Sequence, residues 1–189
     1  GKYKLTLKLY HLSHRHSPVD ELRNVALTPM QELSQLLRES CHLSTLYLDK
    51  LMVILHTRSP APIALSIEEG NLFPLPLTGS GKVLLAYMPN KKELLNKNEI
   101  FKNFTTQEKE EFQQSLKQIN ENGYYIRKSH LAEGVVDISV PVGINHSGII
   151  ACLTISKLTT MNMDQTSNNE RILTELKKCA DTITKRIGL

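Results

Sequence analysis

Apolar residues recur along most of the chain at the periods of strands and helices. Runs with strand character predict strands at 42–48, 51–57, 63–67, 124–128, 135–142 and 148–156. Patterns of helical period predict helices at 19–40, 82–88, within 90–103, after Thr105 and at 165–187. Hairpin-like groups of strands with helices before, between and after them predict an α+β fold, whose antiparallel sheet of about six strands is covered on one face.

Single residues refine the ends of these helices. Pro29 interrupts the first helical pattern, so we expect a break at Thr28, which would cap a restarted helix. Thr105 and Glu108 have the spacing of a capping box, and Gly123 is expected to end the helix that they start.

A turn at Gly79-Ser80-Gly81 precedes an apolar helix. The two glycines allow the backbone to turn sharply and approach a ligand, and the first turn of the helix offers N–H donors to polar oxygens. An ordinary turn capped by Ser80 is the other interpretation. A nucleotide-binding P-loop is excluded, because Pro76 stands where that motif requires glycine and Val83 where it requires Ser or Thr.

The last two predicted strands each have one apolar face and one face of small, mostly polar side chains. The second faces carry Val135, Asp137, Ser139, Cys152, Thr154 and Ser156. Solvated sheet faces usually carry longer polar side chains, so this row favours the floor of a cavity for a polar ligand. A wet sheet face is the alternative.

Composition adds limits rather than a function. The 189 residues, 40% of them hydrophobic, suit one domain with a core of its own. No apolar run is long enough to span a membrane and no signal peptide opens the chain, so a soluble, cytoplasmic protein is expected. The net charge of +4 is spread over the chain and gives no nucleic-acid footprint. Three widely spaced cysteines in apolar segments predict buried free thiols.

The first residues are ambiguous. Tyr3 to Tyr10 fits a strand and a helix equally well. His11, His14 and His16 follow, but no fourth Cys or His stands at zinc-finger spacing, so we interpret them as a linker face and predict no metal and no cofactor.

Taken in order, these motifs resemble the effector-binding domain of IclR-type bacterial transcription regulators. The matching parts are Tyr3 with Leu5, the helix with Leu22, Ala26 and Pro29, and the stretches 42–46, 70–86, 123–124, 134–142 and 153–156. The resemblance implies a GAF-like or profilin-like fold and a homo-oligomer, dimer or tetramer. It also implies an upstream winged helix-turn-helix domain, absent here, that binds operator DNA. Residues 1–17 would then be the linker helix and 18–189 the effector-binding domain.

The resemblance also implies ligand-contact positions. They are Leu65 and Phe73 as apolar walls, Gly79 and Ser80 at the rim, Arg127, and Val135, Asp137, Thr154 and Ser156 on the floor. Pro76 and His130 stand where relatives often have histidine and glutamate, and Asp137 where small or thiol residues are common. Arg127 could hold a carboxylate and Asp137 suits hydroxyl groups, so a sugar acid or hydroxy acid is favoured, with a keto acid as the alternative.

Two competing functions follow from the residues alone. One is a hydrolase built on Ser80, with candidate partners His42, His56, His130 and Asp137. A nucleophile elbow requires Gly-x-Ser-x-Gly, whereas Thr78 and Lys82 occupy the outer positions, so no catalytic residue and no enzyme is predicted. The other is a dimerisation module without a ligand. The favoured prediction is a sensor in which effector binding shifts two arrangements of the domain and the linker transmits the change to the DNA-binding heads.

Overall fold

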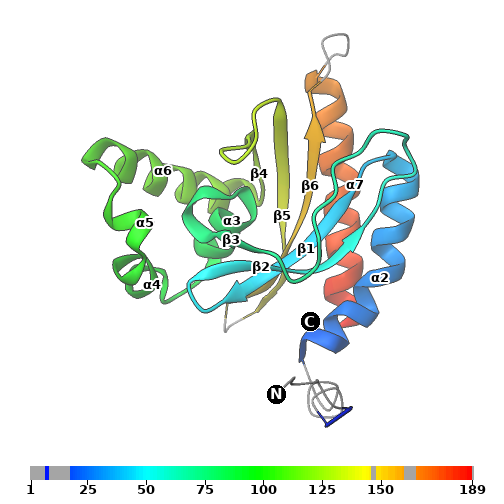
Figure 1. Ribbon diagram of the computed structural model, residues 1–189, viewed down its shortest axis with the longest axis horizontal. Helices are drawn as coiled ribbons and strands as arrows, with labels where there is room; N and C mark the ends of the chain where they lie inside the picture. Colours follow the sequence, from blue (N-terminus) through cyan, green and yellow to red (C-terminus); the bar gives the residue numbers. More distant parts are fainter. Residues whose placement is uncertain (1–6, 9–17, 146–147, 160–164, 189) are drawn as a thin grey trace, which may run out of the picture.

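The computed structural model describes residues 7–8, 18–145, 148–159 and 165–188 (Figure 1). Nearly all of the expected linker, with His11, His14 and His16, lies outside the described residues. So does the centre of the turn between the last two strands.

Six strands form one antiparallel sheet. They are β1 Cys41–Tyr47, β2 Lys50–Thr57, β3 Leu72–Pro74, β4 Tyr125–Lys128, β5 Val135–Asn145 and β6 Gly148–Leu158. Their order across the sheet is β3-β2-β1-β6-β5-β4. The expected α+β fold with an antiparallel sheet of about six strands is therefore confirmed.

The strand expected at 63–67 is wrong. That segment is irregular, and the third strand is β3, which pairs with the start of β2 through Lys50 and Pro74. The side chain of Ile63 is 81% exposed, so the apolar run does not mark a buried strand. The segment instead crosses over the sheet on its way to β3.

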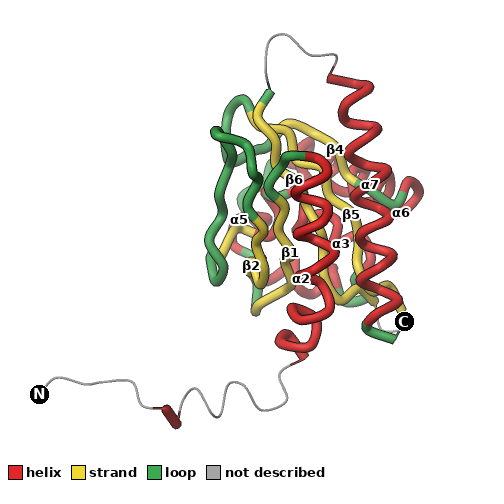
Figure 2. Tube along the Cα trace, turned by 90° about the vertical axis from the view of Figure 1, so that its right-hand side faces the viewer, coloured by secondary structure: helices red, strands yellow, loops and turns green. Residues whose placement is uncertain are grey.

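Helices cover both faces of the sheet, which corrects the expectation of one covered face. They are α2 Pro18–Leu37, α3 Gly79–Tyr87, α4 Lys91–Lys97, α5 Glu99–Lys102, α6 Thr106–Asn122 and α7 Gln165–Arg186, with a short 3₁₀ turn η1 at Leu75–Leu77. Helices α2 and α7 run side by side along one face (Figures 1 and 2). Helices α3 and α6 pack on the other, because residues 79–86 of α3 are buried and need partners all round.

The core is divided by the sheet into two clusters. One joins the apolar face of β5 and β6, with Ile138 and Leu153, to Met30 of α2 and Leu176 of α7. The other surrounds α3 and includes Leu116 of α6. The two-faced pattern expected for β5 and β6 is confirmed, and the small polar face lies on the α3 side.

Helix α2 is continuous, so the expected break at Thr28 is wrong. Pro29 lies inside it, although proline removes one backbone hydrogen bond. Ala26 and Met30 on either side are fully buried, and their burial holds the helix together through this position. The helix ends at Leu37, before Arg38 with its positive φ of 56°.

The expected capping box at the start of α6 is confirmed. Thr105 Oγ1 accepts a hydrogen bond from the Glu108 amide at 3.2 Å, and Glu108 Oε2 accepts one from the Thr105 amide at 2.7 Å. Gly123, with φ of 77°, ends the helix as expected. The solvated stretch 90–103, which precedes α6, forms α4 and α5. Asn98 separates these two helices, and its side chain caps α5.

Among the residues that the structure describes, no helix has the length and apolar character needed to cross a bilayer. The cysteines Cys41, Cys152 and Cys179 are all buried and unbridged, as expected.

Candidate functional site

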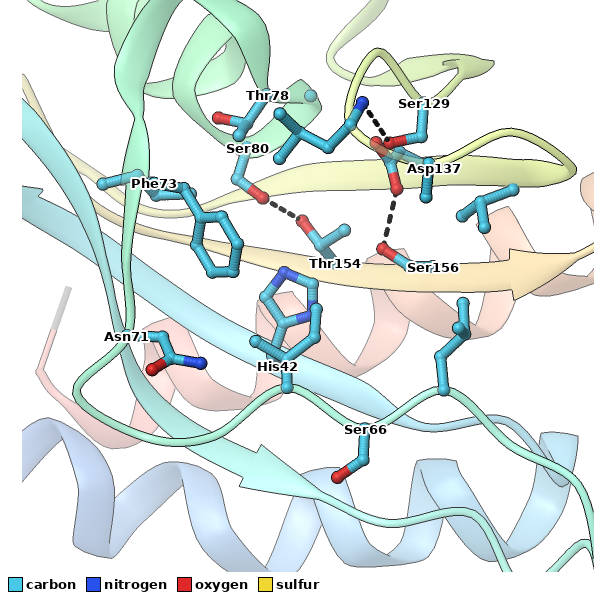
Figure 3. Close-up of a pocket in the computed structure, with 17 residues that line it drawn as sticks. His42, Ser66, Asn71, Phe73, Thr78, Ser80, Ser129, Asp137, Thr154 and Ser156 are labelled. Carbon is cyan, nitrogen blue, oxygen red and sulfur yellow. Dashed lines mark hydrogen bonds between the residues drawn. The ribbon is translucent and has the colours of Figure 1, made fainter.

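A cavity of about 310 Å³ lies on the α3 side of the sheet (Figure 3). Strands β1, β5 and β6 form its floor, the first turn of α3 forms one wall, and the segments 65–73 and 129–132 form the others. This volume is at the lower end of the range for small-molecule sites, so the cavity suits a small ligand.

Eight of the nine predicted ligand-contact residues line this cavity. They are Leu65, Phe73, Gly79, Ser80, Val135, Asp137, Thr154 and Ser156. The ninth, Arg127, does not line it. Its exposed side chain donates a hydrogen bond to the Ile126 carbonyl at 2.9 Å and lies 3.5 Å from Gln118 on α6. The geometric basis for a carboxylate held by Arg127 is therefore missing.

The floor of the cavity is a network of bonded hydroxyl groups. Thr154 donates its hydroxyl hydrogen to Ser139 at 2.8 Å, so Ser80 is the donor in its own 2.7 Å bond to Thr154. Ser156 donates to Asp137 Oδ1 at 2.7 Å. The hydroxyl hydrogens of Ser80, Thr154 and Ser156 are committed within the protein, so these three groups present hydrogen-bond acceptors to the cavity.

Helix α3 is capped by Thr78, not by Ser80 as the ordinary-turn interpretation required. Thr78 Oγ1 accepts a bond from the Gly81 amide at 3.0 Å, and the Thr78 carbonyl accepts one from Lys82. The Ser80 side chain is thus free to reach β6. The amides of Gly79 and Ser80 belong to the first turn, where N–H groups lack acceptors within the helix and the dipole is positive. This wall can receive a carboxylate.

The glycines of this turn are explained by contacts inside the protein rather than by approach to a ligand. A Cβ added at Gly81 would lie 2.0 Å from the Leu75 carbonyl oxygen. A Cβ at Gly79 would lie 2.8 Å from the Tyr125 ring. The turn lies where the sequence predicts it, but the requirement for glycine comes from contacts with η1 and β4.

His42 is a cavity residue that the sequence suggests only as a base for a hydrolase. It lies opposite Thr154 in the pairing of β1 with β6, and its side chain points into the cavity (Figure 3). Burial lowers the pKa of His42 to about 4, with a smaller contribution from His56, so the imidazole is neutral at pH 7. The polar face of β1, which also carries Ser44, was the signal that could have identified it.

The wall formed by 129–132 was also missed, because this segment has no periodic pattern. Lys82 lies behind it, with its Nζ 3.3 Å from His130 Nε2 and 5.4 Å from the centre of the Tyr125 ring. Burial lowers the pKa of Lys82, and burial together with Lys82 lowers that of His130. A neutral His130 can therefore accept a bond from the Lys82 ammonium, which ties this wall to α3.

The arrangement gives no support to a hydrolase. The Ser80 hydroxyl is bonded to Thr154 rather than to a histidine. Within the described part of the chain, no three His, Cys, Asp or Glu side chains are grouped as metal ligands would be.

An α+β domain with a partly enclosed cavity, polar on its floor and apolar on its walls, has the architecture of a small-molecule-binding domain. The family model described as "Bacterial transcriptional regulator IclR C-terminal" matches residues 16–185, and the chain belongs to this family. The resemblance stated from the sequence is confirmed, and the expectation of a non-enzyme agrees with a family of transcriptional regulators.

Relatives agree with the family. The chain is 32% identical over 192 residues to the HTH-type transcriptional regulator KdgR of Dickeya chrysanthemi, covering 99% of this chain and 62% of the relative. It is 34% identical over 159 residues to KdgR of Escherichia coli, covering 82% of this chain and 60% of the relative. The chain thus spans about 60% of the length of these two regulators.

Solved structures show the same fold. The C-terminal domain of E. coli KdgR superimposes with a TM-score of 0.73 at 28% identity, covering 89% of this chain and 99% of that domain. An IclR homolog from Microbacterium hydrocarbonoxydans, complexed with 4-hydroxybenzoate, gives a TM-score of 0.79 at 21% identity, covering 97% of this chain and 75% of that one.

Proposed function

We propose that this chain is the effector-sensing domain of a cytoplasmic bacterial transcription regulator. A small organic acid binds in the cavity and favours one of two arrangements of the domain. A winged helix-turn-helix domain outside residues 1–189 then binds operator DNA with altered affinity, in a dimer or tetramer. The observation that carries this proposal is the cavity, in which residues distant in the sequence converge in a member of a regulator family.

The chemistry of the lining favours an acid that also carries hydroxyl groups. The amides of Gly79 and Ser80 offer donors for a carboxylate at the start of α3. Asp137 and the lone pairs of Ser156 offer acceptors for hydroxyl hydrogens. A sugar acid or hydroxy acid satisfies both ends, whereas a simple keto acid has no hydroxyl hydrogen to donate to Asp137 and is the runner-up. The homolog complexed with 4-hydroxybenzoate, an acid with one hydroxyl, supports this class.

A thermal-stability screen followed by calorimetry tests the proposal. The panel is D-gluconate, D-glucuronate, lactate, pyruvate and 4-hydroxybenzoate, with glycerol as a polyol that lacks a carboxylate. An acid present at a hundred times its dissociation constant should stabilise the domain by about 2.7 kcal/mol. The hydroxylated acids are expected to act more strongly than pyruvate, and glycerol not at all.

The regulatory half of the proposal needs the complete regulator. An acid that binds the domain should change the affinity of the full-length protein for its operator, because coupling requires different effector affinities for the two states. Operator affinity that is unchanged by a bound acid contradicts the sensor. A panel in which no acid stabilises the domain contradicts it as well, and favours a dimerisation module.

A further inference from the structure

His42 places a buried imidazole on the floor of the cavity. Its imidazole is 6% exposed and sits on the floor between β6 and β2, opposite Thr154 on one side and His56 on the other. Figure 3 shows the ring directed into the space beneath Thr154 and Ser156. Among the residues that the structure describes, none forms a hydrogen bond with this ring. A buried ring that lines a cavity without a partner is positioned to bind what enters.

The hydrogen bonds of the floor give this ring a specific role. Ser80, Thr154 and Ser156 have all committed their hydroxyl hydrogens to other protein groups, and Asp137 is an acceptor. A neutral imidazole carries one N–H donor and one acceptor. His42 is therefore the buried side chain on this floor that offers a donor to a ligand oxygen.

The two ends of the cavity floor differ in charge and hydrogen-bonding character. Asp137 on β5 lies opposite Ser156 on β6, and His42 on β1 lies opposite Thr154 on β6. Neighbouring strands are about 4.8 Å apart, so the carboxylate and the imidazole stand about two strand spacings apart. A ligand carboxylate is repelled at the Asp137 end and attracted at the His42 end.

We propose that His42 is a specificity residue of the effector site, which rests on the function proposed above. Its imidazole binds a carboxylate oxygen of the effector and takes up a proton as that anion enters. The hydroxyl groups of the same acid point towards Asp137. The site thus recognises the carboxylate at one end of the acid and the hydroxyl groups at the other, and effector binding is coupled to proton uptake by His42.

The charged and titratable groups around the ring are consistent with proton uptake. His56 faces it from β2, and Asp137 lies on the same floor from β5. Strand β6 contributes hydroxyl groups and the thiol of Cys152, which stays protonated because burial raises its pKa to about 12. Glu69, on the segment that crosses the sheet, bonds the His56 amide and pairs with Arg23, so it is already engaged. Burial lowers the pKa of the His42 imidazole to about 4. A ligand carboxylate placed beside the ring would raise this pKa towards neutrality, because it stabilises the protonated imidazole.

Calorimetry with the panel acids tests this inference. Wild-type chain is titrated with D-gluconate, and with any other panel acid that stabilises it, from pH 5 to pH 8 in buffers of different ionisation enthalpy. We expect net proton uptake and tighter binding as the pH falls, because the complex binds more protons than the free protein. His42→Gln should bind at least tenfold more weakly at pH 5.5 and lose the pH dependence. His56→Gln, the matched control one strand away, should keep it.

The outcomes separate the two proposals. If no panel acid binds the wild-type chain, the proposed sensor function fails and the role of His42 fails with it. If an acid binds wild type and folded His42→Gln with equal affinity and equal pH dependence, only the role of His42 is overturned. The NMR signal of the His42 ring gives a second readout in unmutated protein. Its pKa should rise when the acid is bound, and an unchanged pKa contradicts the proposal.

Discussion

The hydroxyl groups of Ser80 and Thr154 lie 2.7 Å apart and join the first turn of α3 to strand β6. Thr154 passes its own hydrogen to Ser139, so one chain of bonds runs from the wall of the cavity across its floor. These bonds fix the position of α3 over the sheet, and the Ser80 and Thr154 hydroxyl groups are left as acceptors for a ligand.

Ser80→Ala should lower the free energy of unfolding by about 1 kcal/mol, because it removes one buried hydrogen bond while Thr154 keeps its bond to Ser139. Denaturant unfolding with an unchanged m-value measures the loss. Ser66→Ala, at an exposed position of the same cavity, is the matched control and should be neutral. Equal stability of the two variants would show that the Ser80 bond does not hold α3.

Gly81→Ala should be more damaging than Gly79→Ala. The new Cβ at position 81 would lie 2.0 Å from a backbone oxygen of Leu75, so the backbone has to move, at a cost of roughly 2–4 kcal/mol. At position 79 the nearest atoms belong to the Tyr125 ring, which can tilt. Thermal unfolding of both variants ranks them, and the reverse order would contradict this account of the turn.

Thr105→Ala should destabilise the domain by about 1 kcal/mol, because it removes the hydroxyl that caps α6 at the Glu108 amide. Thr106 is also an exposed threonine, one residue later, and it makes no capping hydrogen bond. Thr106→Ala is therefore the matched control and should leave the stability nearly unchanged. Chemical denaturation compares the pair. A similar loss in both would mean that the capping box contributes nothing.

Arg127 and Asp137 should differ in their effects on acid binding. Arg127→Ala is expected to change the affinity for D-gluconate by about twofold at most, because its side chain lies outside the cavity. Asp137→Asn removes a charged acceptor and should weaken gluconate binding by roughly tenfold or more. Pyruvate has no hydroxyl group that could donate a hydrogen bond to Asp137, so it should bind Asp137→Asn at least as well as it binds the wild type. Calorimetry measures both, and a large loss in Arg127→Ala would restore that residue to the site.

Stability should fall as the pH is lowered from 6.5 to 4. Burial lowers the folded-state pKa of His42 from 6.5 to about 4, so in this range the unfolded chain binds more protons than the folded one. The lost stability amounts to about 3 kcal/mol for this group at the lower end. His56 adds to the loss, since burial lowers its pKa too.

Urea unfolding from pH 7.5 to pH 4 measures this slope. His42→Gln should flatten it, whereas His56→Gln should flatten it less, because its pKa shift is smaller. A slope unchanged in His42→Gln would show that this histidine is not buried in its neutral form.

Local patterns predicted most of the secondary structure. Alternation along β5 and β6 separated the core face from the polar face, and Thr105 with Glu108 marked the start of α6. The errors arose where tertiary contacts overrode local signals. Pro29 is accommodated because its neighbours are buried on both sides, and 63–67 is apolar but crosses over the sheet without pairing.

The sequence by itself determined the α+β class, the family resemblance and the two polar strand faces, because these depend on periodicity and on motifs of adjacent residues. Only the tertiary structure decided which residues meet in the cavity. Strand pairing brings His42 beside Thr154, and the Thr78 cap directs Ser80 to the same threonine. The Arg127 side chain is held outside the cavity by the Ile126 carbonyl of its own strand and by Gln118 of α6. Contacts between distant segments fixed these positions, and no local pattern records them.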